Sequence, residues 1–133
     1  MPQALAGGLH VGIATLSTQP QLIHQMLRMA IPTAKDVPVR GGSGAVICED
    51  KSVAVVSEAS KAAVGYGGKQ MHIASLIDTI AERHSVSISA SEVCLIDDDA
   101  TNIMIAEQCN MVGLWLDPKD PDAMYRILSI KSH

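Results

Sequence analysis

The sequence predicts an α/β domain with a three-layer, Rossmann-like parallel sheet, and two observations predict it. Short apolar runs rich in β-branched residues alternate along the chain with segments whose apolar residues recur at helical spacing, which is typical of parallel strands joined by crossover helices. The 133 residues, 47% apolar and 18% charged, suit one ordered domain and exclude a disordered chain. We therefore expect residues 1–133 to form a single domain.

The first predicted elements are a strand and a helix. Residues 10–14 form a short apolar run that stops at polar residues 15–18, which predicts a buried strand followed by a loop. Pro20 then opens an amphipathic helix that Pro32 closes. Its apolar face consists of Leu22, Ile23, Met26, Leu27 and Ala30.

The middle of the chain predicts a small hairpin and then a long helix. Residues 37–39 are a short extended piece, and the glycines of 41–44 break the chain after it. The β-rich runs 45–48 and 52–56 predict a hairpin, while residues 57–65 fit a short helix or an irregular loop equally well. The long helix follows Gly67 and Gly68 and extends to His84, with an apolar stripe of Ile73, Ile77, Ile80 and Ala81.

The last third predicts two strands that each precede a helix. Ser89 and Glu92 match a capping pattern, which we interpret as a single turn before a strand at 93–96. A helix then ends near Asn110, and residues 111–116 form another apolar strand. Asp120 as N-cap, with proline at the next position, begins a final helix whose inward residues are Met124, Ile127 and Leu128.

The sharpest chemical feature is the acidic triplet that follows the strand at 93–96. Ligands of open α/β sheets bind at the carboxyl ends of strands, and three adjacent carboxylates repel one another unless a cation offsets their charge. Mg²⁺ prefers such oxygen ligands, so we expect a metal site formed by Asp97, Asp98 and Asn102. In the alternative interpretation, Asp99 caps the next helix and the other two carboxylates are solvated.

A phosphate site is expected from residues at two other positions. Thr15 and Ser17 follow the first strand, and the Thr15 hydroxyl could bind a phosphoryl oxygen. Lys69 lies at a helix N-terminus beside glycines, where a cation is unfavourable unless an anion is near. The alternative is that Lys69 is an ordinary surface lysine and that Thr15 simply ends a strand.

Together these segments resemble the haloacid dehalogenase-like (HAD) superfamily. Residues 11–15 (VGIAT), 68–70 (GKQ) and 95–99 (LIDDD) with Asn102 look like its second, third and fourth motifs, in order, within a resemblance that covers about residues 9–130. The resemblance implies phosphohydrolase (phosphatase) chemistry: Thr15 binds phosphate, Lys69 neutralises phosphate and nucleophile, and Asp98 holds Mg²⁺ with help from Asp97 and Asn102. In this family, inserted cap segments largely set substrate specificity. The resemblance therefore implies that residues 40–68, which include the predicted hairpin, act as a small cap-like insertion.

The chain departs from the family at the first motif. That motif, Asp-x-Asp, supplies the aspartyl nucleophile and ends the central strand of the family's sheet, yet no Asp or Glu precedes Thr15. We therefore expect the first central strand to be missing, and the chain to be inactive alone. Truncation, natural degeneration to a pseudoenzyme, or a strand supplied by another chain would each explain the departure.

Two other function classes stay open. A non-catalytic domain could use the acidic residues only to bind a metal or a partner. A receiver-like signalling domain has a similar acidic pocket, but its phospho-acceptor lies about two strands downstream and only 34 residues follow Asp99.

Composition narrows the partners. Ten basic against fourteen acidic residues, and only three aromatic residues, argue against nucleic acid, whereas a phosphorylated small molecule or phosphoprotein fits the expected site. An oligomer, or a missing N-terminal segment, would complete the sheet. The chain shows neither a signal peptide nor a membrane span, and its three cysteines lack metal-ligand spacing, so we expect buried reduced thiols and a cytoplasmic location.

Overall fold

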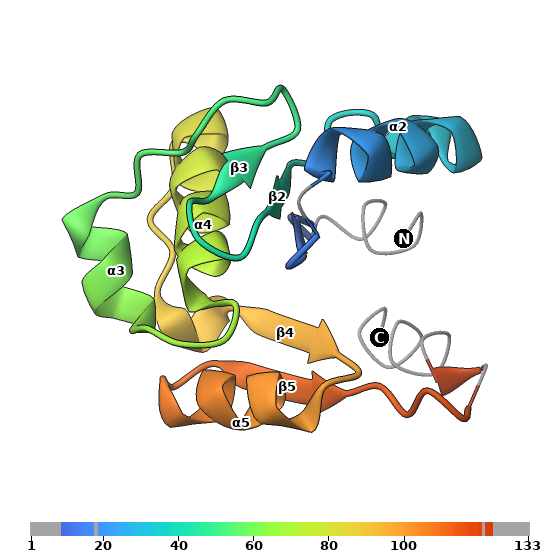
Figure 1. Cartoon of the computed structure of the whole chain (residues 1–133). Helices are drawn as coiled ribbons and strands as arrows, with labels where there is room; N and C mark the ends of the chain where they lie inside the picture. Colours follow the sequence, from blue (N-terminus) through green and yellow to red (C-terminus); the bar gives the residue numbers. More distant parts are fainter. Residues whose placement is uncertain (1–8, 18, 121, 124–133) are drawn as a thin grey trace.

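The computed structural model describes residues 9–17, 19–120 and 122–123, and Figure 1 shows the course of the chain. Helices and strands are interspersed along these residues, so the predicted α/β class is confirmed at this coarse level. The strands are β1 (Ile13–Ala14), β2 (Val39–Gly41), β3 (Ile47–Cys48), β4 (Cys94–Asp97) and β5 (Val112–Trp115). The helices are α2 (Pro20–Ala30), α3 (Glu58–Val64), α4 (Gln70–His84) and α5 (Ala100–Gln108), with short 3-10 turns at Pro32–Ala34 and Ala90–Glu92.

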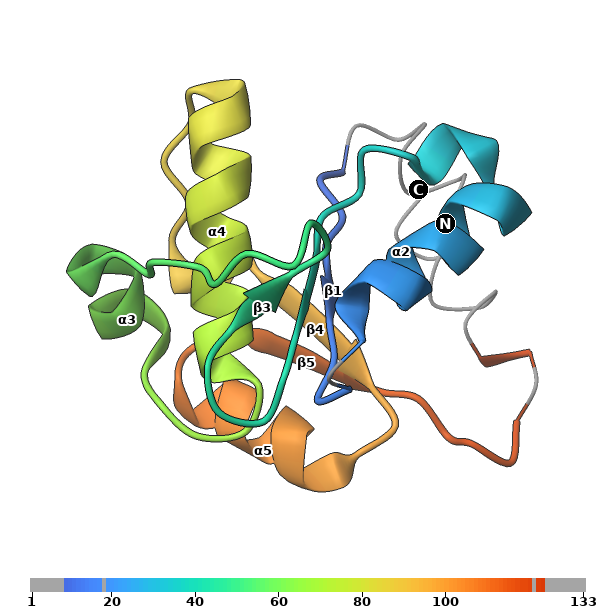
Figure 2. The same ribbon diagram turned by 45° about the horizontal axis from the view of Figure 1, so that its top comes forward.

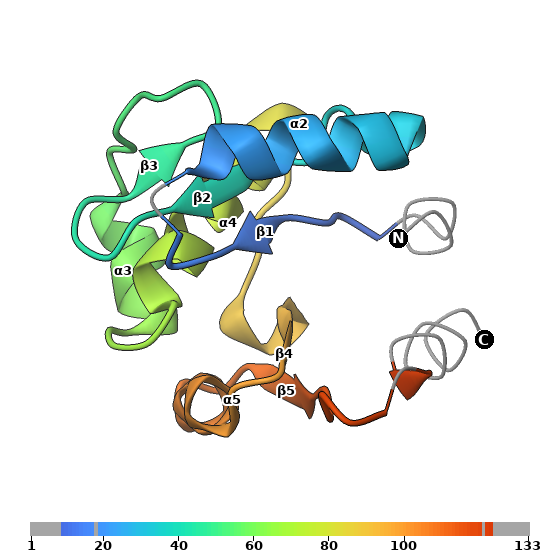
Figure 3. The same ribbon diagram turned by 45° about the vertical axis from the view of Figure 1, so that its right-hand side comes forward.

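The first sheet contains three strands in the order β1-β2-β3. Strand β1 pairs in parallel with β2, with Ile13 opposite Val39, and helix α2 makes the crossover between them. Strand β3 pairs antiparallel with β2. Helices α2 and α4 cover opposite faces of this sheet, as Figures 2 and 3 show.

The second sheet is the parallel pair β4-β5, joined by helix α5. Its register places Asp97 opposite Trp115 at the carboxyl ends of the two strands. In Figures 1 and 3 these three elements form a group below the first sheet. Both parallel pairs follow the predicted strand–helix–strand order, but in the described part of the chain they belong to separate sheets.

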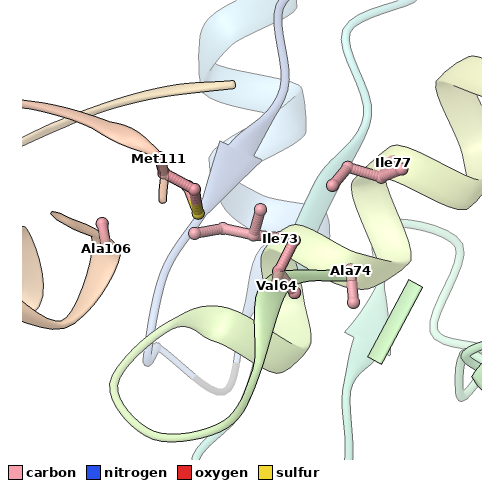
Figure 4. Packing of buried hydrophobic residues seen from close by; sticks show 6 residues of the cluster. All are labelled: Val64, Ile73, Ala74, Ile77, Ala106 and Met111. Carbon is pink, nitrogen blue, oxygen red and sulfur yellow. The ribbon is translucent and has the colours of Figure 1, made fainter. Parts of the chain in front are cut away.

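A small aliphatic core joins the two groups of elements. Figure 4 shows its six buried side chains, which come from α3, α4, α5 and the residue before β5. Partly buried Leu95 of β4 packs against this cluster. Helix α4 is therefore packed against both sheet groups. The six residues are Val64, Ile73, Ala74, Ile77, Ala106 and Met111.

Several local predictions can be compared with the structure. The segment left open at 57–65 is helix α3, because the Ser57 side chain accepts a hydrogen bond from the Ser60 amide as an N-cap. The predicted hairpin is reduced, since the second run contributes only an isolated bridge between Ile47 and Val53. The Ser89–Glu92 capping box and the single turn before β4 are confirmed. The final helix expected at 121–128 falls almost entirely outside the described residues.

Two further expectations concern the surface. Cys48 is buried, but Cys94 is exposed, so the expectation that the thiols are buried is wrong for Cys94. Within the described residues, no helix combines the length and the apolar character needed to cross a membrane.

Candidate functional site

Asp97 ends strand β4 and is buried, with 3% of its side chain exposed. Its Oδ1 accepts a hydrogen bond from the Asp99 amide at 2.9 Å, and its Oδ2 accepts one from Asn102 Nδ2 at 3.2 Å. Lys69 Nζ lies 2.9 Å from the same Oδ2. Burial by itself raises the pKa of Asp97, but the Asp99 amide, Lys69 and Asn102 together hold that pKa below its ordinary value. Asp97 is therefore an anion fixed by three neighbours.

Lys69 occupies the N-cap position of α4, and 18% of its side chain is exposed. A cation is unfavourable at a helix N-terminus because the backbone amides there carry partial positive charge. Here Asp97 offsets that charge. The interpretation of Lys69 as an ordinary surface lysine is therefore wrong.

Asn102 is buried in the first turn of α5, and the glycine loop, residues 65–68, lies directly against it. A Cβ added to Gly68 would come within 2.9 Å of Asn102 Oδ1, and Gly68 has a φ of +49°, so the backbone needs glycine here. The close approach places the segment before Lys69 beside the amide that binds Asp97. Residues Lys69, Asp97 and Asn102 thus form one cluster drawn from α4, β4 and α5.

The two other carboxylates of the acidic segment, residues 97–99, have different roles. Asp99 is the N-cap of α5 and accepts a hydrogen bond from the Thr101 amide at 2.8 Å, as the alternative interpretation predicts. Asp98 is exposed, and its backbone carbonyl accepts a hydrogen bond of 2.9 Å from Trp115 Nε1. Asp98 and Asp99 are both exposed, but the Asp99 carboxylate caps α5, so Asp98 is the exposed carboxylate of the segment that has no capping role.

Thr15 and Ser17 belong to the loop that follows β1. The Thr15 hydroxyl accepts a hydrogen bond from the Ser17 amide at 3.1 Å, and the Ser17 hydroxyl accepts one from the Gln19 amide at 3.2 Å. Both hydroxyls keep a proton to donate. In the described part of the chain, no hydrogen bond or ion pair joins these two residues to Lys69, Asp97 or Asn102.

An indirect link joins the Thr15 loop to the start of α4. The Gly42 amide donates to the Ser17 carbonyl at 2.7 Å, and the Gly42 carbonyl is 2.7 Å from Nε2 of buried His72. His72 lies in the first turn of α4, close to Lys69 in the chain. The contact of His72 with a glycine thirty residues earlier in the chain has no signal in the sequence.

The donor chemistry fits Mg²⁺, with one constraint. Mg²⁺ binds in proteins through one or two carboxylates together with waters, and Asp98 and Asp97 supply such oxygens. Lys69 already occupies one side of Asp97 Oδ2, so exposed Asp98 would be the more accessible of the two carboxylates for a metal ion. No group of three or more His, Cys, Asp or Glu side chains placed to hold a metal occurs among residues 9–17, 19–120 and 122–123.

Comparison with protein-family models, with curated proteins and with solved structures finds no match to this chain.

Proposed function

We propose that this chain is a HAD-like phosphohydrolase-type domain that binds Mg²⁺ and a phosphate group but has no aspartyl nucleophile of its own, and that it is therefore inactive alone. Its ligand is a phosphorylated small molecule or a phosphoprotein. We also propose that the two small sheets are parts of one Rossmann-like sheet whose first central strand is missing from this chain.

The observation that carries this proposal is the cluster of Lys69, Asp97 and Asn102. A lysine at a helix N-terminus, a carboxylate at the end of a parallel strand and an amide in the following helix meet within hydrogen-bonding distance. Lys69 is distant in the sequence from Asp97 and Asn102, and the resemblance names all three. A carboxylate with neighbouring donors, buried at a strand end, is a common setting for a binding site.

Each residue has a distinct part in the proposed site. Asp98 and Asp97 would hold Mg²⁺, and Asn102 orients Asp97. Bound Mg²⁺ would offset the negative charge of a phosphoryl group. Lys69 and the hydroxyls of Thr15 and Ser17 would contact the phosphate oxygens, with the Thr15 loop kept in position by Gly42 and His72.

The arrangement of strands supports the missing central strand. Strands β1 and β4 each run parallel to one neighbour, and they belong to different sheets in the described part of the chain. Helix α4 packs against β1 and β2 and shares a core with Leu95 of β4. One more strand between β1 and β4 would give a continuous sheet under this helix.

Thermal unfolding with and without millimolar Mg²⁺ and inorganic phosphate tests the site. A ligand that binds only the folded state adds about 2.7 kcal/mol at a hundredfold excess over its Kd, so the midpoint should rise. Asp98→Asn should abolish the effect of Mg²⁺, whereas Asp36→Asn, another exposed carboxylate, should retain it. A wild-type midpoint that neither ligand moves would contradict the proposal.

The second candidate is a non-catalytic domain that binds a metal or a partner. The surface of helix α2 favours it, because Leu22, Met26 and Met29 are 46%, 62% and 83% exposed on an otherwise amphipathic helix. Exposed apolar side chains grouped on one helix are typical of interaction surfaces. Sedimentation of the purified chain distinguishes the candidates: self-association lost in Met26→Lys would favour this second function.

A further inference from the structure

The few aromatic side chains of this protein are placed unusually. The sequence contains only Tyr66, Trp115 and Tyr125, and no phenylalanine. The two that the structure describes are both exposed, Tyr66 by 68% and Trp115 by 52%, while the core cluster is wholly aliphatic. An exposed aromatic ring keeps a flat apolar face available for contact with a ligand.

Trp115 lies directly beside the proposed metal and phosphate site. It is the last residue of β5, opposite Asp97 of β4 in the sheet register. Its indole N–H donates to the Asp98 carbonyl at 2.9 Å, which fixes the ring against the acidic segment. A ring already held in one orientation loses little conformational freedom when a ligand stacks on it.

Tyr66 lies on the other segment that forms the site. It belongs to the glycine loop, whose Gly68 backbone lies against Asn102, and Lys69 follows that loop directly. The two described aromatic residues therefore come from segments next to the Lys69–Asp97–Asn102 cluster: Tyr66 from the loop that leads to Lys69, and Trp115 from the strand paired with β4.

We propose that this site takes phosphate esters whose ester group carries a planar aromatic ring, and that Trp115 is the surface on which the ring stacks. This inference rests on the proposed function, since it assigns a substrate class to that same site. The phosphate would meet Lys69 and the ring would lie on the indole. Stacking on an aromatic face favours planar rings over saturated groups of equal size, because a flat π-face makes closer contact.

Isothermal titration with Mg²⁺ present tests this inference with four probes: inorganic phosphate, phenyl phosphate, cyclohexyl phosphate and AMP. Phenyl phosphate should bind about tenfold or more tightly than cyclohexyl phosphate, its saturated match. Trp115→Leu should remove this difference; its comparison is Trp115→Phe, since both variants lose the indole hydrogen bond to the Asp98 carbonyl and only the phenylalanine keeps a ring. Trp115→Phe keeps a ring and should keep most of the preference, and Met29→Ala, at an exposed site on α2, should keep all of it.

The outcomes separate this inference from the function on which it rests. Equal binding of phenyl and cyclohexyl phosphate, or a preference that survives in Trp115→Leu, overturns the aromatic substrate class while the phosphate site stands. If none of the four anions binds, both proposals fail. If the ring preference holds, the affinities of AMP and phenyl phosphate are compared. Tighter binding of AMP indicates a ring carried on a sugar, and tighter binding of phenyl phosphate indicates a ring esterified directly to phosphate.

Discussion

The ammonium group of Lys69 lies 2.9 Å from the carboxylate of Asp97, with 18% and 3% of the two side chains exposed. This ion pair connects the start of α4 to the end of β4, and so connects elements of the two sheet groups. Lys69, which we propose binds phosphate, is thus in direct contact with Asp97, which we propose binds the metal. A bound Mg²⁺ and Lys69 would share the Asp97 carboxylate.

Removing the lysine should destabilise the protein measurably. Lys69→Met leaves Asp97 buried without its cation, which should lower the free energy of unfolding by about 1–3 kcal/mol. Lys61→Met is the matched control, because Lys61 pairs with Glu58 at 3.1 Å on an exposed helix surface, where ion pairs contribute about 0–1 kcal/mol. Urea unfolding of both variants checks this, and equal losses would contradict a special role for the buried pair.

Stability should fall on the acid side of neutrality. Hydrogen-bond donors around Asp97 hold its pKa below the ordinary value. The pKa of Asp78 is lowered as well: burial raises it, but the hydrogen bonds from the Ser57 amide and from the Ser60 and Ser57 hydroxyls outweigh that effect. A group with a depressed pKa stabilises the fold above its ordinary pKa and loses this effect as pH falls through the folded value. We therefore expect the free energy of unfolding to decrease as pH falls below about 4.

Substitution at each carboxylate identifies its share of that decrease. Asp97→Asn and Asp78→Asn should each make the profile of unfolding free energy against pH shallower between about pH 2 and 5, and the double variant shallower still. The slopes are compared rather than the absolute stabilities, because both variants also lose hydrogen bonds. A profile of Asp97→Asn parallel to that of the wild type would refute the shifted pKa.

The glycine loop should tolerate no side chain at Gly68. Its φ of +49° and the 2.9 Å approach of a Cβ to Asn102 Oδ1 predict that Gly68→Ala lowers stability by about 1–2 kcal/mol or more. Gly44→Ala is the control, because a Cβ there meets nothing within 4 Å. Thermal melts compare the two. If Gly68→Ala is as stable as Gly44→Ala, the loop does not lie against Asn102.

Arg40 should be irreplaceable by lysine. Its guanidinium is buried and donates to Glu49 at 2.5 Å, to Thr79 at 2.7 Å and to Ser75 at 2.9 Å, which joins β2 to α4. A lysine offers one nitrogen and cannot reach these separate acceptors, so Arg40→Lys should cost about 3 kcal/mol. Arg28→Lys, on exposed α2, should change the unfolding midpoint in urea by little. Equal midpoints for the two variants would show that the network contributes nothing.

Local sequence signals predicted local structure well. The run from Pro20 to Pro32 gave helix α2, the Ser89–Glu92 pattern gave a capped turn, and Asp99 caps α5 as its alternative interpretation suggested. Such signals depend on hydrogen bonds between residues a few positions apart, which one short segment contains completely. Strand lengths were overestimated because a strand also needs a partner, which its own sequence does not record. Residues 10–14 have strand character, but only Ile13–Ala14 pair with β2.

Relationships between distant segments could be predicted only through the family resemblance. The alternatives for Lys69 and Asp97 stayed open in the sequence because a buried ion pair depends on how α4 meets β4, which no local pattern records. The Trp115–Asp98 and His72–Gly42 hydrogen bonds had no signal at all. Metal binding, phosphate binding and the aromatic substrate class stay predictions.

The division into two sheets has a consequence for how the molecule opens. In the described part of the chain no strand pairing joins β4–α5–β5 to the rest. This unit is held by side-chain and loop contacts instead, among them a small aliphatic cluster, the Lys69–Asp97 ion pair, the Gln70–Met111 contact of 3.3 Å and the glycine loop against α5. Cooperative units bounded by few contacts open by sub-global unfolding at lower free energy than the whole domain. The amides of β5 should therefore exchange with solvent deuterium through a separate, easier opening than those in the centre of α4.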